Sequence, residues 1–187
     1  MAARRVFFYV QHLLGIGHLR RAATIARALD TAGLDVMVVS GGGEVPGLNI
    51  GGATLVQLNA TRAADLYFKK LLDENGAPID DAWRAQRRDA LLAAFEAFEP
   101  HVCMFELFPF GRRQMRFELM PVLDAGIARA HRPSIVSSVR DILVAQNKPG
   151  RNDEMLDLVG RYFDHIVVHG DPAFIGFERT FPYAARI

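Results

Sequence analysis

The chain has 187 residues, half of them hydrophobic, which suits one compact domain with a buried core. Its formal net charge of +1 provides no overall attraction for nucleic acid, and its one cysteine, Cys103, excludes an internal disulfide. No apolar run approaches the roughly 18 residues that a membrane-spanning helix requires, so we expect a protein of the reducing cytoplasm.

The first third of the chain alternates apolar runs with one amphipathic segment. Continuous apolar residues predict buried strands over 6–11, 36–40 and 53–58. Leucine and alanine recur at helical spacing over 18–32, and Gly33 follows in the position that commonly ends a helix. We therefore expect strand, helix, strand and strand in this order.

The middle of the chain contains the segment that is hardest to assign. Residues 59–78 show no clear period and include the turn-forming pair Asn75-Gly76, which indicates a long, partly irregular excursion with a hairpin. A helix is predicted from about 80 to 99, because acidic residues favour its N-terminus and apolar residues recur along it. A strand over 101–107 follows, in which Cys103 is expected to be a buried core residue.

The last third continues the alternation of helices and strands. A helix is predicted over 111–130, and Pro121 within it should kink or break it. Strands over 134–139 and 165–169 flank a helix over 152–163.

Six short apolar strands separated by crossover helices predict a Rossmann-like α/β fold with a doubly wound parallel sheet. Ligands of such sheets bind beyond the carboxyl ends of the strands. That rule selects the segments 11–21, 40–43, 59–62, 106–113, 140–141 and 169–171.

The loop after the first strand carries the clearest binding signal. Gly15 and Gly17 allow a sharp turn and close approach of a ligand, and the free amides of the following helix can hold an anion. The dinucleotide fingerprint fails here, because Arg20 replaces its third glycine and Ser40 stands where an acidic residue is expected.

Three polar residues open the helix that follows this loop. His18 can act as a base near neutral pH at the ligand-binding edge of the sheet. Arg20 and Arg21 oppose the helix dipole in the first turn, so a bound anion would explain them, and a solvated helix face explains them as well.

A carboxylate and several arginines follow the later strands. Glu106 leaves its strand beside Arg112 and Arg113, and its role as a general base, a sugar-hydroxyl ligand or an ion-pair partner stays open. The two arginines can hold a phosphate through bidentate contacts. Arg140 with Asp141 fits a ligand contact or a structural salt bridge. The spacing of the histidines matches no zinc motif, so we expect no metal.

Three strings in the sequence resemble a known family. Residues 15–29, G-I-G-H-L-R-R-A-A-T-I-A-R-A-L, resemble the N-terminal motif of GT-B glycosyltransferases of the MurG-like, family 28 type. The strings E-L-F-P-F-G-R-R-Q-M-R-F-E-L and S-V-R-D-I-L are similar to those of a bacterial group of predicted glycosyltransferases. The loop L-G-I-G-H has fewer glycines than the MurG pattern, which leaves the identity of the acceptor open.

The resemblance implies two Rossmann-like domains that face a cleft. Residues 1–187 would form the N-terminal domain, which binds the acceptor, and a C-terminal domain outside this chain would bind most of the nucleotide-sugar donor. The implied activity is hexosyl transfer to a hydroxyl of a sugar or lipid-linked acceptor, without a metal or another cofactor.

The resemblance also suggests roles for the site residues. His18 and Glu106 are the catalytic candidates, with His18 first as a positioning residue or general base. The candidates for substrate binding are Gly15, Gly17, Arg20, Arg112 and Arg140.

A contact with the inner face of the membrane is one interpretation of the segment 108–117. Its phenylalanines Phe108, Phe110 and Phe117 alternate with arginines and could form an apolar and basic surface. The other interpretation places the aromatic rings in the core.

Two other functions fit the same pattern. A non-hydrolysing nucleotide-sugar 2-epimerase shares this architecture and would act on a UDP-sugar without an acceptor. A non-enzymatic α/β binding module, complete in itself, is the second alternative.

Overall fold

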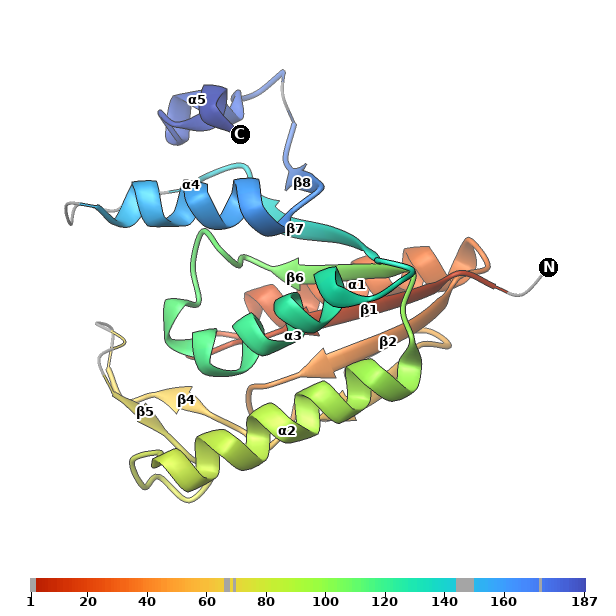
Figure 1. Ribbon diagram of the computed structural model, residues 1–187, viewed down its shortest axis with the longest axis vertical. Helices are drawn as coiled ribbons and strands as arrows, with labels where there is room; N and C mark the ends of the chain where they lie inside the picture. The colour runs from red at the N-terminus through yellow and green to blue at the C-terminus, as the bar shows by residue number, and fades with distance from the viewer. Residues whose placement is uncertain (1–2, 66–67, 69, 144–149, 172) are drawn as a thin grey trace.

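A computed structural model describes residues 3–65, 68, 70–143, 150–171 and 173–187. Its centre is a six-stranded parallel sheet in the order β3-β2-β1-β6-β7-β8 (Figure 1). The strands are β1 (Arg5–Val10), β2 (Asp35–Ser40), β3 (Thr54–Gln57), β6 (Val102–Glu106), β7 (Ser134–Arg140) and β8 (His165–His169). All six predicted strands and their parallel pairing are confirmed, in the strand order of a Rossmann-like fold.

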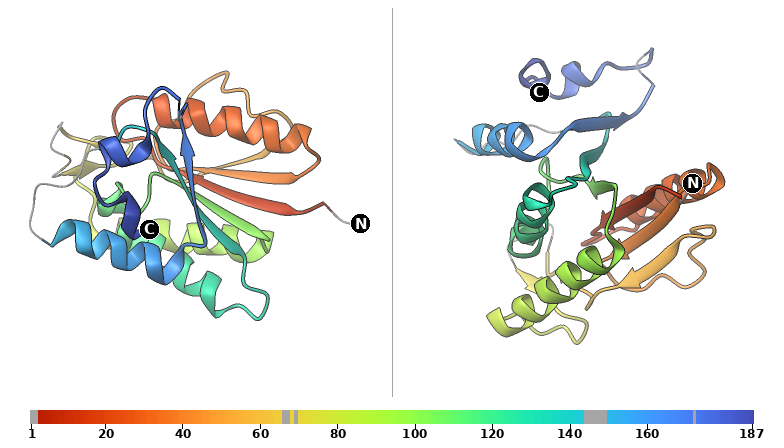
Figure 2. Two further views of the ribbon diagram at one scale, coloured as in Figure 1. Left: turned by 90° about the horizontal axis from the view of Figure 1, so that it is seen from above. Right: turned by 45° about the vertical axis from the view of Figure 1, so that its right-hand side comes forward.

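Helices cover both faces of this sheet (Figures 1 and 2). One face carries α1 (Gly17–Thr31), and the other carries α2 (Asp81–Phe98), α3 (Arg116–Ala128) and α4 (Arg151–Tyr162). The C-terminal segment ends with the short helix α5 (Phe177–Thr180) and the turn Ala184–Arg186.

Alternation along β1 explains why both faces must be covered. Phe7 and Tyr9 are buried on the face of α2 and α3, whereas Phe8 and Val10 are buried on the face of α1. Successive strand side chains point to opposite faces, so an apolar run without polar interruptions requires a helix on each side. Cys103 lies in this core, and burial raises the pKa of its thiol to about 12.

The predicted helix over 111–130 begins five residues later than expected. Residues 107–112 form a loop, followed by a 3₁₀ turn over Arg113–Met115, and α3 begins at Arg116. The reason is local, since Leu107 and Arg112 have left-handed backbone angles (φ of 67° and 60°) that no helix accommodates. Pro121 does not end α3, because its neighbours Leu119 and Val122 hold that turn in the core.

The irregular excursion over 59–78 contains the expected hairpin. The strands β4 (Arg62–Ala63) and β5 (Leu71–Leu72) pair in antiparallel fashion. Gly76 adopts a φ of 84° in a separate turn, where its amide donates to the carbonyl of Asp73 at 3.2 Å.

The phenylalanines of 108–117 do not form a membrane surface. Phe108 and Phe110 are buried, and Phe117 is partly buried against the main core. The interpretation that these rings belong to the core is therefore correct, and the three phenylalanines do not supply the apolar part of the alternative surface. Among the described residues, no helix is long and apolar enough to cross a membrane.

An ion pair between α2 and α3 lies wholly inside the protein. The guanidinium of Arg87 and the carboxylate of Glu118 are both fully buried and lie 2.6 Å apart. Arg87 also donates to the carbonyl of Gly41 at 2.8 Å, and Tyr9 donates to Glu118. A side chain at Gly41 would collide with Arg87, so this glycine of the 41–43 loop is required by packing.

Candidate functional site

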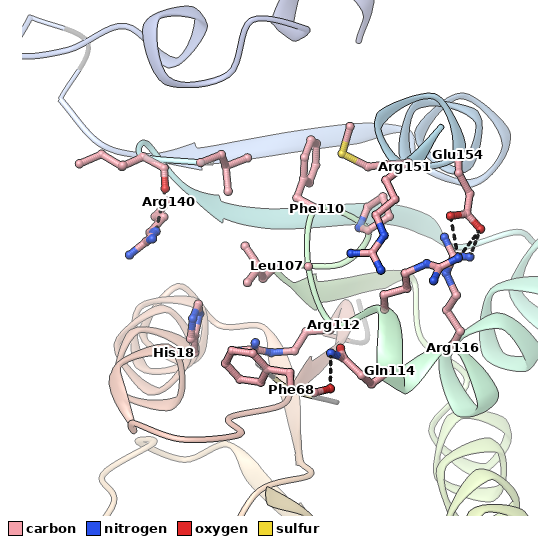
Figure 3. Close-up of a pocket in the computed structure, with 16 residues that line it drawn as sticks. His18, Phe68, Leu107, Phe110, Arg112, Gln114, Arg116, Arg140, Arg151 and Glu154 are labelled. Atoms are coloured by element: carbon pink, nitrogen blue, oxygen red, sulfur yellow. Dashed lines mark hydrogen bonds and ion pairs between the residues drawn. The ribbon is translucent and has the colours of Figure 1, made fainter. Parts of the chain in front are cut away.

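A cleft of about 380 Å³ opens at the carboxyl ends of β6 and β7 (Figure 3). It lies between the start of α1, the loop after β6, the loop after β7 and the first turns of α3 and α4. This is the edge of the sheet at which parallel α/β folds bind ligands. His18, Arg112 and Arg140 of the predicted site all line it.

Glu106 is the last residue of β6, and its side chain is fully buried beside the cleft. Its Oε1 atom lies 2.9 Å from Nδ1 of His18 and also accepts a hydrogen bond from Arg21, while Oε2 accepts from Ser138 at 2.8 Å. Burial alone would raise the pKa of Glu106, but the hydrogen bonds from His18, Arg21 and Ser138 and the charge of Arg21 hold the pKa below its ordinary value. Glu106 is therefore ionised at neutral pH, although its side chain is fully buried.

The contact with Glu106 fixes the orientation and the tautomer of His18. The carboxylate can only accept, so Nδ1 of His18 carries a hydrogen, and the lone pair of the neutral ring lies on Nε2. The His18 side chain is 25% exposed and lines the cleft. The arrangement can take a proton at Nε2 and stabilise the resulting imidazolium through Glu106.

A second histidine joins this network through a serine. The Oγ atom of Ser138 donates to Glu106 and lies 2.9 Å from Nε2 of His169, at the end of β8. Since the serine hydrogen is already donated to the carboxylate, His169 donates to Ser138. Burial, followed by the charge of Arg21, lowers the pKa of His169, which favours the neutral ring that this contact uses.

The first turns of α1 bring Arg21 to the site and leave Arg20 outside it. Arg20 is exposed on α1 and does not line the cleft, whereas Arg21 pairs with Glu106. One step along a helix turns a side chain by about 100°, so only one of the two arginines faces the sheet. Sequence reasoning selected Arg20 for the site, and the structure places its neighbour there.

The glycines of the loop are not needed for the predicted sharp turn. Neither Gly15 nor Gly17 has a positive φ, so the expected sharp turn does not require them. A Cβ atom at either position would meet nothing within 4 Å. The space around both positions is open at the N-terminus of α1, as close approach of a ligand requires, and the N-cap residue Ile16 makes no side-chain cap hydrogen bond.

Arginines from several segments line the rest of the cleft. Nε of Arg112 donates to the carbonyl of Gln11 at 2.7 Å, and Nε of Arg140 donates to the carbonyl of Ile142 at 2.7 Å. Arg113 and Arg116 pair with Glu154 of α4. Sequence reasoning missed Arg116 and Glu154 because α3 and α4 meet only in the folded chain.

Both ends of the loop after β6 carry backbone strain. Leu107 and Arg112 are non-glycine residues in the left-handed region, a conformation that costs on the order of 1 kcal/mol each. Such strain persists where the surrounding structure demands it, often at ligand-binding sites. Both residues line the cleft.

Among the described residues, no three histidine, cysteine, aspartate or glutamate side chains gather as a metal site would require.

Comparison with solved structures identifies the fold. The chain aligns over 97% of its length with CalG4, the calicheamicin glycosyltransferase, at a TM-score of 0.52 and 14% identity, covering 51% of that chain. It aligns over 88% of its length with MurG of Acinetobacter baumannii, at a TM-score of 0.50 and 10% identity, covering 41% of that chain. This chain therefore has the Rossmann-like fold of the GT-B glycosyltransferases and spans about half the length of these two proteins or less.

The sequence by itself matches no protein-family model. No curated protein matches it significantly either.

Proposed function

We propose that this chain is the acceptor-binding half of a glycosyltransferase that moves a sugar from a nucleotide-sugar donor to an acceptor hydroxyl. The observation that carries the proposal is the hydrogen bond of 2.9 Å between His18 and the buried Glu106 at the edge of the cleft. The GT-B fold supports the same class of reaction.

In the proposed reaction, Nε2 of His18 removes the proton of the acceptor hydroxyl as its oxygen attacks the anomeric carbon of the sugar. The new glycosidic bond forms while the bond between that carbon and the diphosphate oxygen breaks, and the nucleoside diphosphate leaves with the bonding electron pair. Glu106 offsets the positive charge that develops on His18. A base of this kind contributes about 10²–10⁴-fold to a rate.

We further propose that the donor binds mainly to a second domain outside this chain. The coverage of 41% and 51% of the two neighbours supports this division. Calorimetry of the 187-residue chain with UDP- and GDP-sugars tests it. We expect weak binding or none, and micromolar affinity would contradict the division.

A transfer assay tests the proposed activity. Full-length protein is incubated with a panel of nucleotide-sugars, with and without acceptor hydroxyl compounds, and the products are identified by mass spectrometry. Acceptor-dependent release of nucleoside diphosphate supports the proposal. Epimerisation of the nucleotide-sugar without an acceptor would assign the fold to an epimerase, and the absence of turnover across the panel would favour a binding module.

A further inference from the structure

The cleft has a large excess of positive charge. Among the described residues, its lining includes five arginines and a single carboxylate, that of Glu154. The arginines are Arg112, Arg113, Arg116, Arg140 and Arg151. Like charges gathered around one cleft repel one another unless an anion lies among them.

Glu154 already acts as an anion for part of this cluster. Its two carboxylate oxygens lie 3.3 and 3.1 Å from Nη2 of Arg113, and Nη1 of Arg116 donates to Oε1. The hydrogen bond from Arg116 is the main reason why the pKa of Glu154 lies below its ordinary value. The Nε atom of Arg116 is buried and has no hydrogen-bond partner in the described part of the chain, so one carboxylate leaves this cluster incompletely satisfied.

The charged cluster and the proposed base occupy different ends of the cleft. Figure 3 shows His18 and Arg140 at one end and Arg116, Arg151 and Glu154 at the other. Apolar side chains line the space between them, including Leu107 and Phe110. A molecule that fills the cleft therefore meets His18 and Arg140 at one end, the apolar side chains together with Arg112 in the middle, and the arginines that pair with Glu154 at the other end.

We propose that this cleft binds an anionic acceptor with an apolar body, and that Arg113 and Arg116 hold its phosphate or carboxylate group in place of Glu154. The acceptor hydroxyl then lies toward His18, and Leu107 and Phe110 pack against the body of the acceptor. Guanidinium groups suit this role because their planar donors match the oxygens of a phosphate or carboxylate. The assignment to the acceptor rests on the proposed function, whereas the anion site itself does not.

Binding to the 187-residue chain tests the site without any need for turnover. Phenyl phosphate, benzoate and uncharged benzyl alcohol are titrated by calorimetry at constant ionic strength. We expect phenyl phosphate to bind at least about tenfold more tightly than benzyl alcohol, because charge-assisted hydrogen bonds are the stronger ones. Equal affinity for the charged and uncharged probes would overturn the proposal.

Two variants with opposite expected effects on the affinity for phenyl phosphate distinguish a binding role from a structural one. Glu154→Gln removes the internal anion and should tighten the binding of phenyl phosphate by about fivefold, whereas Arg116→Gln should weaken it by about tenfold. Glu96→Gln is the matched control, since it frees Arg129 from a surface ion pair away from the cleft and should leave affinity unchanged. Weaker binding in a folded Glu154→Gln variant, with circular dichroism as the check, would contradict the exchange of anions.

Three further measurements identify the source of the anion and keep the two proposals apart. Vesicles that contain phosphatidic acid, compared with soluble phenyl phosphate, distinguish a lipid phosphate from a free one, and binding of either supports the site. UDP is also tested as a competitor of phenyl phosphate. If it competes, and if Arg116→Gln weakens the binding of UDP as much as that of phenyl phosphate, the cluster binds the donor and the acceptor assignment is wrong. If the 187-residue chain binds phenyl phosphate while the full-length protein transfers no sugar, the proposed function alone is refuted and the anion site stands.

Discussion

Two buried carboxylates of this protein, Glu118 and Glu106, both pair with a cationic side chain, but the two cations differ in their exposure to solvent. Each is fully buried and each binds an arginine. The partner of Glu118, Arg87, is also fully buried, whereas the partners of Glu106, His18 and Arg21, are 25% and 24% exposed beside the cleft. The comparison teaches that burial of the cation, and not of the carboxylate, separates a pair that supports the fold from one that can meet a ligand.

Arg87 and Glu118 form what we call the closed pair, since both side chains are fully buried, and this pair connects several segments. Arg87 reaches the carbonyls of Gly41 and Asn59 and the side chain of Gln11, and thus joins α2 to the loops after β1, β2 and β3. The backbone carbonyl of Gln11 in turn accepts a hydrogen bond from Arg112 of the loop after β6. The closed pair therefore helps to hold the cleft loop in place through Gln11.

Breaking the closed pair should produce the largest effect on stability. Arg87→Met leaves the charge of Glu118 buried without its partner and should cost about 3–5 kcal/mol of the free energy of unfolding in urea. The double variant Arg87→Met with Glu118→Leu should recover much of that loss. Arg88→Met, at a partly exposed neighbour, should stay within about 0.5 kcal/mol. A loss below about 1 kcal/mol for Arg87→Met would show that the closed pair does not support the fold.

His18 and Glu106 form what we call the open pair, since His18 is partly exposed in the cleft, and changes to this pair should affect activity more than stability. His18→Ala in the full-length protein should lower the rate of transfer by about 10²–10⁴-fold, because a general base is lost. Its unfolding midpoint should fall only modestly, because Glu106 loses one hydrogen bond but keeps those from Arg21 and Ser138. His131→Ala, at an exposed histidine before β7, is the matched control and should keep its rate. Near-normal turnover, or failure of the variant to fold, would give His18 a structural role.

The pKa of Glu106 predicts how the open pair depends on acidity. Its folded pKa lies below the unfolded value of about 4.3, so its stabilisation is complete above that value and declines as the pH falls through the folded pKa. The difference in unfolding free energy between the wild type and Glu106→Gln should be about 2 kcal/mol at pH 7 and should shrink below about pH 4. A difference that grows on acidification would contradict an ionised Glu106.

The smallest effect is expected at the serine that links Glu106 to His169. Ser138→Ala removes one hydrogen bond to the carboxylate and should lower the transfer rate by about fivefold. Ser137→Ala is the matched control, because this buried neighbour donates to the carbonyl of Phe108 and does not contact Glu106. Both variants should lose similar stability, and an equal loss of rate in both would remove Ser138 from the network.

The sequence was sufficient for the fold because its signals are local. Each apolar run became a strand, and Gly33 follows the first helix as predicted, with a φ of 82°. The late start of α3 was missed because the strain at Leu107 and Arg112 is set by the cleft loop and not by residue propensity. Burial of Arg87 was also beyond local reasoning, because its partner Glu118 lies on another helix.

The site was only partly predictable for the same reason. His18 and Glu106 were each selected from their positions after strands, but their contact joins residues 88 positions apart. The contact of Arg21 with Glu106 was not predicted, because the direction of a helix relative to the sheet decides which side chain turns inward. Glu154 gave no signal, since an acidic residue in the first turn of a helix is ordinary.

A double-mutant cycle on the open pair tests most directly whether His18 and Glu106 act as one catalytic unit. Transfer rates are measured for His18→Ala, Glu106→Gln and the double variant in the full-length protein. If Glu106 acts only through His18, the double variant should be about as slow as His18→Ala alone, because residues that work as a unit are not additive. Losses that multiply in the double variant would show that the two residues act independently and would contradict the proposed dyad.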